Sequence, residues 1–506
     1  MKRIIFFVFS LLFSLQIFAQ EILYSPSHRD DDVDIYFDIL GKVGNNFIFY
    51  KGLGTRHFLQ VVDNKMKEIS NERLKFLDDR LLNIDFVLYP DYFYMIYQKQ
   101  KNRVIYCNAA KFNDKGQMLG NEFTLDTTKV GMFDNNKIYS TAISEDKKKI
   151  LIYKMRFTGD ELTLVSKRLN ENLATTDSLR YLFHYNKYRD VYSDLQIAND
   201  GSIVFSKQVT RGNRETSNNA EIYTIPVNAD KYQVLPLSLG DKYIDEVRIK
   251  IDNLNNNFLV NSFYYIKKNG NIEGLFTALL NKNAMLGKQA FIAFPDSLRA
   301  KITEGKYRSA FDDMFVRNTF LKKDGSFILV AEDYSSQTSG SNWNRWDYLY
   351  GSPYYNSNYY NYYPGYYNYY RPYNNYNRNQ VTRYTYNNIM LMSIDSSLKP
   401  VWTNIVLKNQ TDDNNENYLS YGYVNVGKEI YFLFLEKIRN QQVVSNQALT
   451  ADGSITRYAT LKSREKGYHF MPRFTRQVGL YEVIIPVVYR GLICFAKVDF
   501  SKNTVQ

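Results

Sequence analysis

A strongly apolar, strand-sized segment recurs along this chain about every fifty to sixty residues. Each copy follows a polar turn and is rich in Tyr, Phe, Ile and Val, which favour strands. The eight copies begin at Phe47, Phe93, Ile150, Ile203, Phe258, Phe327, Ile430 and Tyr481. A period of this length indicates a repeated structural unit.

The spacing of these segments supports one repeated unit. Successive starts are 46, 57, 53, 55, 69, 103 and 51 residues apart. The gap of 103 contains an insertion of about fifty residues, and without it this gap matches the others. A second landmark agrees, since Met118–Gly120 and Met285–Gly287 share the sequence Met-Leu-Gly and lie 167 residues apart, about three periods.

The order of strands within a unit indicates the fold. An inner strand, a turn, the strong apolar strand and a looser turn precede a strand that ends in Asp or Asn, as at Leu391–Asp395. Units of four antiparallel strands with this period are typical of β-propeller blades, which bury their faces by stacking around an axis. We therefore predict an all-β propeller of eight blades, with seven as the second choice because the first units are the least regular.

Closure of the ring is also predicted from the sequence. The last unit has three recognisable strands and ends at Phe500, so Glu21–Tyr24 is the candidate for its missing strand. Such pairing would cover an otherwise open sheet edge. The best helix candidate is the short segment 71–82. An outer-membrane barrel is the competing all-β fold, but many strands here are shorter than barrel strands and are apolar on successive residues.

The first nineteen residues have the pattern of a secretory signal peptide. Met1–Arg3 carries two positive charges, an apolar run follows from Ile4 to Leu15, and a small residue, Ala19, stands at the expected cleavage point. The run is too short for a membrane-spanning helix, and no Cys adjoins the cleavage point to carry a lipid. We expect residues 20–506 to form the propeller domain, exported to the periplasm and peripherally associated with the outer membrane.

Charge and cysteine content narrow the class of protein. The formal charge of +12 falls to +10 once Lys2 and Arg3 are removed. The basic residues are scattered and have acids nearby, as in Glu145–Lys149, whereas nucleic-acid-binding proteins concentrate them on one face. We therefore expect no nucleic-acid partner. Cys107 and Cys494 each lie in an apolar strand, so we predict two buried free thiols rather than a disulfide.

No motif in the sequence identifies an enzyme, and we predict no catalytic residue, no metal site and no cofactor. The four histidines lack metal-ligand spacing. Two acidic segments, 30–34 and 412–416, have the oxygen ligands that calcium prefers, although polar turns use the same residues. Glycosidases need paired carboxylates, and among 52 acidic residues the sequence selects no pair. A glycan-cleaving activity therefore stays open.

The insertion in the sixth unit, which we place at residues 335–386, is rich in Tyr and Asn. Fourteen of the 29 residues from Tyr348 to Tyr376 are Tyr, and no Asp or Glu occurs from Tyr348 to Tyr386. Tyr and Trp provide flat apolar contact area with a polar tip, as binding loops require. The competing interpretation is a low-complexity insertion with no selected role. The candidate partner-binding residues are Trp343, Trp346, Tyr354, Tyr355, Tyr359, Tyr360, Tyr362, Tyr363, Tyr366 and Tyr367.

Several features together resemble exported β-propeller proteins of the Bacteroidota cell envelope. These are the signal ending in Phe-Ala-Gln, the strands rich in Tyr, Asn, Ile and Lys, and Asp-Gly turns such as Asp200-Gly201, Asp324-Gly325 and Asp452-Gly453. The resemblance implies a periplasmic or surface subunit of an outer-membrane assembly. The export signal and the aromatic insertion then favour a non-catalytic periplasmic propeller that binds an outer-membrane protein complex, of the translocon or transporter type. The alternative function is a propeller that binds or cleaves glycans.

Overall fold

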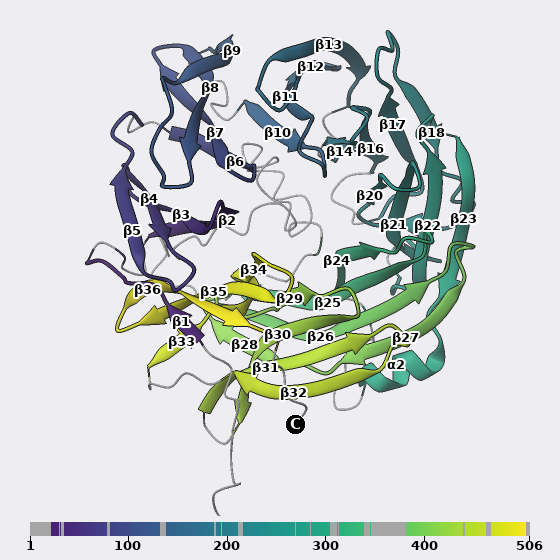
Figure 1. Ribbon diagram of the computed structural model, residues 1–506. Coiled ribbons are helices and arrows are strands. Elements are labelled where there is room, and N and C mark those ends of the chain that lie inside the picture. The colour runs from purple at the N-terminus through teal and green to yellow at the C-terminus, as the bar shows by residue number, and fades with distance from the viewer. Residues whose placement is uncertain are drawn as a thin grey trace, which may run out of the picture.

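The computed structural model is a β-propeller, in which eight antiparallel sheets of four or five strands form a ring (Figure 1). This confirms the predicted all-β class and the eight blades. The structure describes the residues 22–29, 31, 35–77, 81–131, 138–186, 189–193, 195–210, 216–268, 270–283, 285–303, 311, 313–338, 345, 381–438, 441–461 and 467–501.

Blades 1 to 4 follow one another along the chain, and each begins with the strand nearest the ring centre (Figure 1). Blade 1 comprises β2 (Tyr36–Val43), β3 (Asn46–Leu53), β4 (Arg56–Val62) and β5 (Glu68–Arg73). Blade 2 comprises β6 (Leu81–Leu88), β7 (Tyr92–Lys101), β8 (Val104–Asn113) and β9 (Phe123–Lys129). Blade 3 comprises β10 (Tyr139–Ile143), β11 (Ile150–Thr158), β12 (Glu161–Leu169) and β13 (Thr175–His184). Blade 4 comprises β14 (Asp190–Tyr192), β15 (Gln196–Ile197), β16 (Ile203–Val209), β17 (Ala220–Ile225) and β18 (Gln233–Pro236).

Blades 5 to 8 complete the ring, and the last one takes a strand from the start of the chain. Blade 5 comprises β19 (Tyr243–Ile244), β20 (Arg248–Asp252), β21 (Asn257–Tyr265), β22 (Gly274–Asn281) and β23 (Leu286–Ala293), followed by helix α2 (Asp296–Thr303). Blade 6 comprises β24 (Met314–Leu321), β25 (Phe327–Thr338), β26 (Thr382–Ile394), β27 (Pro400–Val406) and β28 (Gln410–Asp413). Blade 7 comprises β29 (Gly422–Asn425), β30 (Glu429–Ile438), β31 (Gln441–Thr450) and β32 (Ile455–Leu461). Blade 8 comprises β33 (Tyr468–Phe470), the 3-10 helix η1 (Pro472–Phe474), β34 (Arg476–Gln477), β35 (Glu482–Tyr489), β36 (Leu492–Asp499) and β1 (Ile22–Tyr24).

The strong apolar segments are the second main strand of every blade, namely β3, β7, β11, β16, β21, β25, β30 and β35. They are apolar on successive residues because a neighbouring blade covers each face. In β21, Phe258 and Val260 pack with blade 4 residues, whereas Leu259 and Phe263 pack with blade 6 residues. The core therefore lies between the blades.

The predicted closure of the ring is confirmed. Strand β1 pairs with β36 from Ile22 opposite Val498 to Tyr24 opposite Ala496. The next residue extends the contact, since Ser25 N donates to Phe495 O at 2.8 Å. The start and the end of the described chain thus share one sheet, which covers the edge of β36.

The predicted helix at 71–82 is wrong. Residues 71–73 end strand β5, residues 81–82 begin β6, and a turn with the buried side chains Leu74 and Leu77 lies between them. Strand β5 is an exposed outer strand, so its polar residues lack the alternation that identifies a half-buried strand. No helix in the described part of the chain is long and apolar enough to span a membrane.

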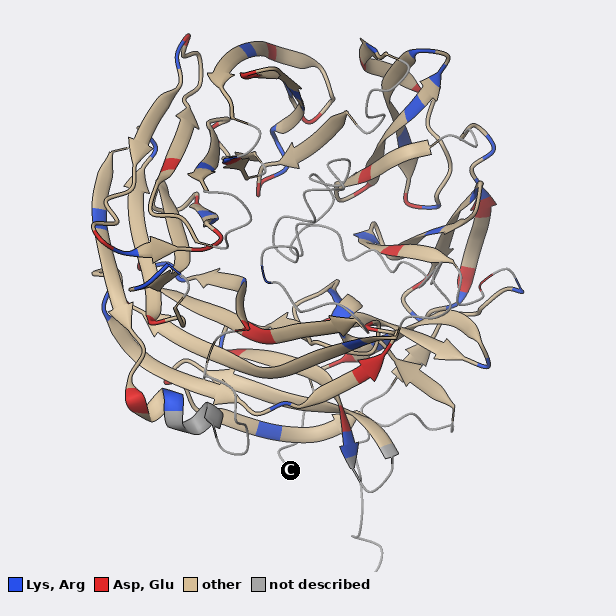
Figure 2. Ribbon diagram, turned by 180° about the vertical axis from the view of Figure 1, so that it is seen from behind, with Lys and Arg blue, Asp and Glu red and all other residues tan. Residues whose placement is uncertain are grey.

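The distribution of charged residues and the state of the two cysteines match the expectations from the sequence. Lys and Arg are interspersed with Asp and Glu around the described part of the ring (Figure 2). Cys107 in β8 and Cys494 in β36 are buried and free, as predicted.

Candidate partner-binding face

The ten aromatic residues predicted to contact a partner lie outside the described residues, so their role stays a prediction. They are Trp343, Trp346, Tyr354, Tyr355, Tyr359, Tyr360, Tyr362, Tyr363, Tyr366 and Tyr367. The structure does describe the hairpin that carries them.

That hairpin, which we call the stalk, is formed by β25 and β26. Its strands pair from Phe327 opposite Ile394 to Thr338 opposite Thr382. Residues 335–338 and 382–386, which the sequence analysis assigned to the insertion, are therefore strand residues. At 12 and 13 residues, these are the longest strands described. The insertion proper lies between Thr338 and Thr382.

A third strand braces the stalk. Strand β28 pairs with β26 from Tyr386 opposite Gln410 to Arg383 opposite Asp413. Arg383 binds Asp413 through two hydrogen bonds, Nε to Oδ1 at 2.8 Å and Nη2 to Oδ2 at 3.1 Å. Asn414 accepts a hydrogen bond from Thr382 N through Oδ1 at 2.8 Å and donates its own N–H to Thr382 O at 2.7 Å. Hydrogen bonds between β28 and β26 therefore continue to Thr382, in the last residue pair of the stalk.

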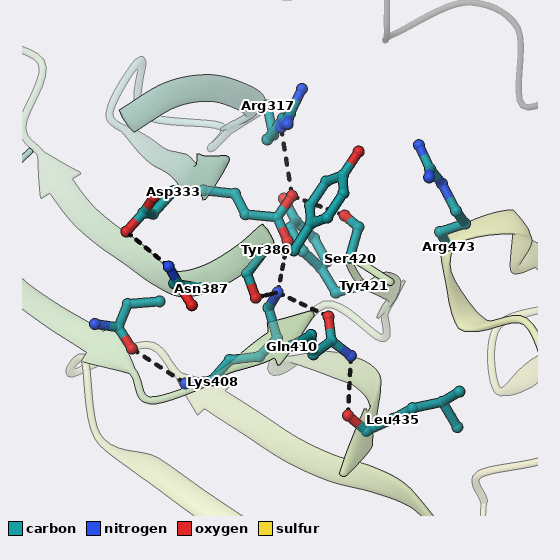
Figure 3. Close-up of polar contacts among 12 residues, drawn as sticks. Arg317, Asp333, Tyr386, Asn387, Lys408, Gln410, Ser420, Tyr421, Leu435 and Arg473 are labelled. Atoms are coloured by element: carbon teal, nitrogen blue, oxygen red, sulfur yellow. Dashed lines mark hydrogen bonds and ion pairs between the residues drawn. The ribbon is translucent and has the colours of Figure 1, made fainter. Parts of the chain in front are cut away.

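The base of the stalk contributes to a group of buried and half-buried polar side chains, which we call the inner polar cluster (Figure 3). It draws on blades 6, 7 and 8 and comprises Arg317, Glu332, Tyr386, Lys408, Glu416, Ser420 and Arg473. At its centre, Lys408 Nζ lies 2.9 Å from Glu332 Oε1, and both side chains are 0% exposed. Ser420 Oγ donates to Glu332 Oε2 at 2.7 Å.

Lys408 lies between three oxygen atoms of its neighbours. Its Nζ donates hydrogen bonds to Tyr386 O at 3.1 Å and to Gln410 Oε1 at 3.0 Å, and it forms an ion pair with Glu332. Burial lowers the pKa of Lys408 from its ordinary value, against the opposing effect of the Glu332 carboxylate. Lys408 therefore links Glu332 of β25 and Tyr386 of β26 to Gln410 of β28.

Glu416 connects the stalk to blade 8. Tyr386 Oη donates to Glu416 Oε2 at 2.7 Å, and Arg473 Nη1 lies 3.3 Å from the same oxygen. Burial raises the pKa of Glu416, but Arg473 and the Tyr386 hydroxyl outweigh it and hold the pKa below its usual value. The Arg473 guanidinium also lies 5.4 Å from the centre of the Tyr386 ring. Strand β26 is therefore held by β28 within blade 6 and, through Tyr386, by Arg473 of blade 8.

One residue between the two stalk strands is described, and it also contacts the ring. Arg345 Nη2 lies 2.7 Å from Asp245 Oδ2 in blade 5, and its guanidinium carbon lies 3.8 Å from the centre of the Phe315 ring in blade 6. This pair was not predicted from the sequence, because its members are 100 residues apart. Glu332 and Lys408 were not predicted either, although each is a charged residue at the end of an apolar strand segment, which was a usable signal.

The predicted acidic segments do not form a calcium site among the described residues. Asp413 is used by Arg383 and Glu416 by Arg473. Asp31 forms a buried ion pair with Lys51 at 2.6 Å, while 30 and 32–34 lie outside the described residues. In the described chain, no group of three metal-binding side chains is found.

The glycan hypothesis requires carboxylates that can reach a substrate. Four described carboxylates of blades 5 and 6 and of the connection to blade 7 have a cation beside them, whereas Asp333 accepts a hydrogen bond from Asn387 Nδ2 at 3.4 Å. The pairs are Asp245 with Arg345, Glu246 with Arg248, Glu332 with Lys408 and Glu416 with Arg473. A general acid or base must reach its substrate, and the side chains of Glu332 and Asp245 are 0% and 2% exposed. For these two carboxylates, structural ion pairing is favoured over acid–base catalysis.

Comparisons with known proteins complete these observations. No protein-family model and no curated protein matches the sequence. Among solved structures, the polysaccharide lyase Uly1 is similar over 82% of this chain and 89% of its own, with 10% identity and a TM-score of 0.38. A PL25 ulvan lyase is similar over 83% and 92%, with 11% identity and a TM-score of 0.36. A prolyl endopeptidase is similar over 84% of this chain and 56% of its own, with 8% identity and a TM-score of 0.34.

Proposed function

We propose that this protein is a non-catalytic periplasmic propeller that binds an outer-membrane protein complex, of the translocon or transporter type, through its aromatic insertion. The observation that supports this most is the braced stalk. An insertion without a role needs only a hairpin to return the chain, whereas β28, Asn414 and the Arg383–Asp413 pair hold the hairpin to its last residues.

The physical advantage of such a stalk is lower entropy loss on binding. Ordering the backbone costs about 1–2 kcal/mol per residue, and a rigid base removes part of that cost before the partner arrives. Tyr side chains then provide contact area with few rotatable bonds. A braced base with an aromatic tip is therefore suited to protein binding.

The test replaces the ten candidate aromatic residues with serine in the full chain. This variant keeps the insertion length, the described residues of the stalk and Arg345. Tagged wild-type and variant proteins are purified from detergent-solubilised envelopes, and recovered proteins are identified by mass spectrometry. We expect one outer-membrane complex to co-purify with the wild type only, and to bind it again when both are purified separately.

A matched control replaces exposed aromatic residues elsewhere on the ring. Phe123 on blade 2 and Tyr481 on blade 8 are 39% and 37% exposed, and their serine variants should keep the complex. Recovery of the wild type without any envelope partner would refute the proposal. Osmotic-shock fractionation tests the location, and we expect the mature protein in the periplasmic fraction.

Glycan binding is the second candidate, because part of the inner polar cluster reaches solvent. The side chains of Glu416 and Arg473 are 35% and 24% exposed, although the Tyr386 ring that they contact is buried. A few convergent polar groups of this kind can fix the orientation of a ligand such as a sugar. Binding on a glycan array that is lost in Glu416→Gln but retained in the serine variant would favour this function over the first.

A further inference from the structure

Asp245 is a buried carboxylate whose position is set by the ring itself. It lies between β19 and β20 and is 1% exposed. Ser262 Oγ and Phe263 N donate to its Oδ1 at 3.0 and 3.1 Å, and Tyr265 Oη donates to Oδ2 at 3.1 Å. All three donors belong to β21. Blade 5 therefore supplies three hydrogen bonds that orient the carboxylate, in addition to its contact with the insertion.

Beside this carboxylate lies a flat apolar face. The Phe315 ring on β24 is 1% exposed and receives the Arg345 guanidinium at 3.8 Å from its centre. Asp245 binds the same guanidinium at its Oδ2, 2.7 Å from Arg345 Nη2. A guanidinium group is planar, is weakly hydrated and stacks on aromatic faces while donating in its own plane. A lysine ammonium has no plane to cover the ring.

The other charged residues near Asp245 are paired with different partners. Glu246, the next residue, forms an ion pair with Arg248 at 2.8 Å, so the charge of Arg248 balances Glu246. Burial raises the pKa of Glu246. Arg317, the other cation close to Glu246, lies 3.4 Å from Glu332. Arg345 is thus the cation that directly compensates Asp245.

We propose that the wall between blades 5 and 6 contains a guanidinium-binding socket, formed by Asp245 and Phe315, which Arg345 occupies and which attaches the insertion to the ring at a second point. The ligand class is an arginine side chain or an alkylguanidinium ion. The socket is independent of the proposed function, since it operates in the isolated protein.

The site is tested by chemical rescue in the full chain. Arg345→Ala removes the occupant and leaves a prearranged carboxylate next to a vacated volume. We expect a lower Tm, which millimolar ethylguanidinium largely restores and ethylammonium at the same concentration does not. Arg345→Lys should stay close to the alanine variant, because an ammonium group cannot stack on Phe315.

Two controls assign the effect to the socket. The wild type, whose socket is filled, and the double variant Asp245→Asn/Arg345→Ala, whose carboxylate is gone, should not respond to ethylguanidinium. If Arg345→Ala does not fold alone, its refolding yield with and without ethylguanidinium becomes the measurement. Equal responses to both ions, or no response of the single variant, would overturn the socket. Neither result bears on envelope binding, which is measured separately.

Discussion

Replacing Lys408 with methionine tests whether the inner polar cluster holds the stalk in place. Met approximates the length of the Lys chain but removes the ammonium group, so the Glu332 carboxylate loses the cation at 2.9 Å while both positions remain inaccessible to solvent. Removing one partner of a buried ion pair costs about 3–5 kcal/mol. Ser420 and Arg317 still contact Glu332, so we expect the lower end, about 3 kcal/mol.

The same energy predicts a measurable shift in Tm. Unfolding entropy is about 2.1 cal/mol/K per residue, which for the roughly 400 described residues corresponds to about 0.8 kcal/mol/K. A loss of about 3 kcal/mol therefore lowers Tm by about 4 °C. Differential scanning calorimetry and urea unfolding would measure it.

Two further variants decide whether the reasoning holds. The double variant Lys408→Met/Glu332→Leu removes both charges, and apolar replacement of a buried pair is often neutral. It should recover part of the loss, because Arg317 and Ser420 lose their contacts with Glu332. Lys282→Met breaks the more exposed pair with Asp200 at 2.7 Å and should cost under about 1 kcal/mol. The reasoning is refuted if Lys408→Met costs no more than Lys282→Met, or if the double variant is no better than the single one.

Three other predictions follow from burial and closure. Burial raises the pKa of Asp38 to about 6 from an unfolded value of 3.8, so the contribution of Asp38 to stability falls as pH rises from about 4 to 6. Asp38→Asn should then match the wild type at pH 4 and exceed it by up to about 3 kcal/mol at pH 7; an equal difference at both pH values in urea titrations would contradict this. A chain that begins at Pro26 lacks β1 and exposes the edge of β36, so it should show a lower Tm and more aggregation by light scattering than a chain that begins at Gln20; equal behaviour would argue against closure by β1. Burial raises the pKa of Cys107 above its ordinary value and that of Cys494 to about 12, so a thiol reagent at pH 8 should label neither in the native protein and both after denaturation; rapid native labelling would contradict their burial.

The ring could be predicted from the sequence because its main strands have a local signature. A strand covered by blades on both sides is apolar on successive residues, as in Phe47–Tyr50 and Phe258–Val260. The outer strands have no such signature, since one edge of each is solvated. That is why the polar end of β5 was taken for helix, and why the boundary of the insertion missed the outer part of the stalk.

The number of blades, the closing strand and the place of the insertion could be derived from patterns of neighbouring residues along the chain. The charge pairs could not. Glu332 and Lys408 come from separate segments of blade 6, and Arg345 meets Asp245 of blade 5 across 100 residues of chain. The first contact depends on how the strands of one blade fold together and the second on how the chain after β25 returns to a neighbouring blade, and neither is encoded in a single stretch of sequence.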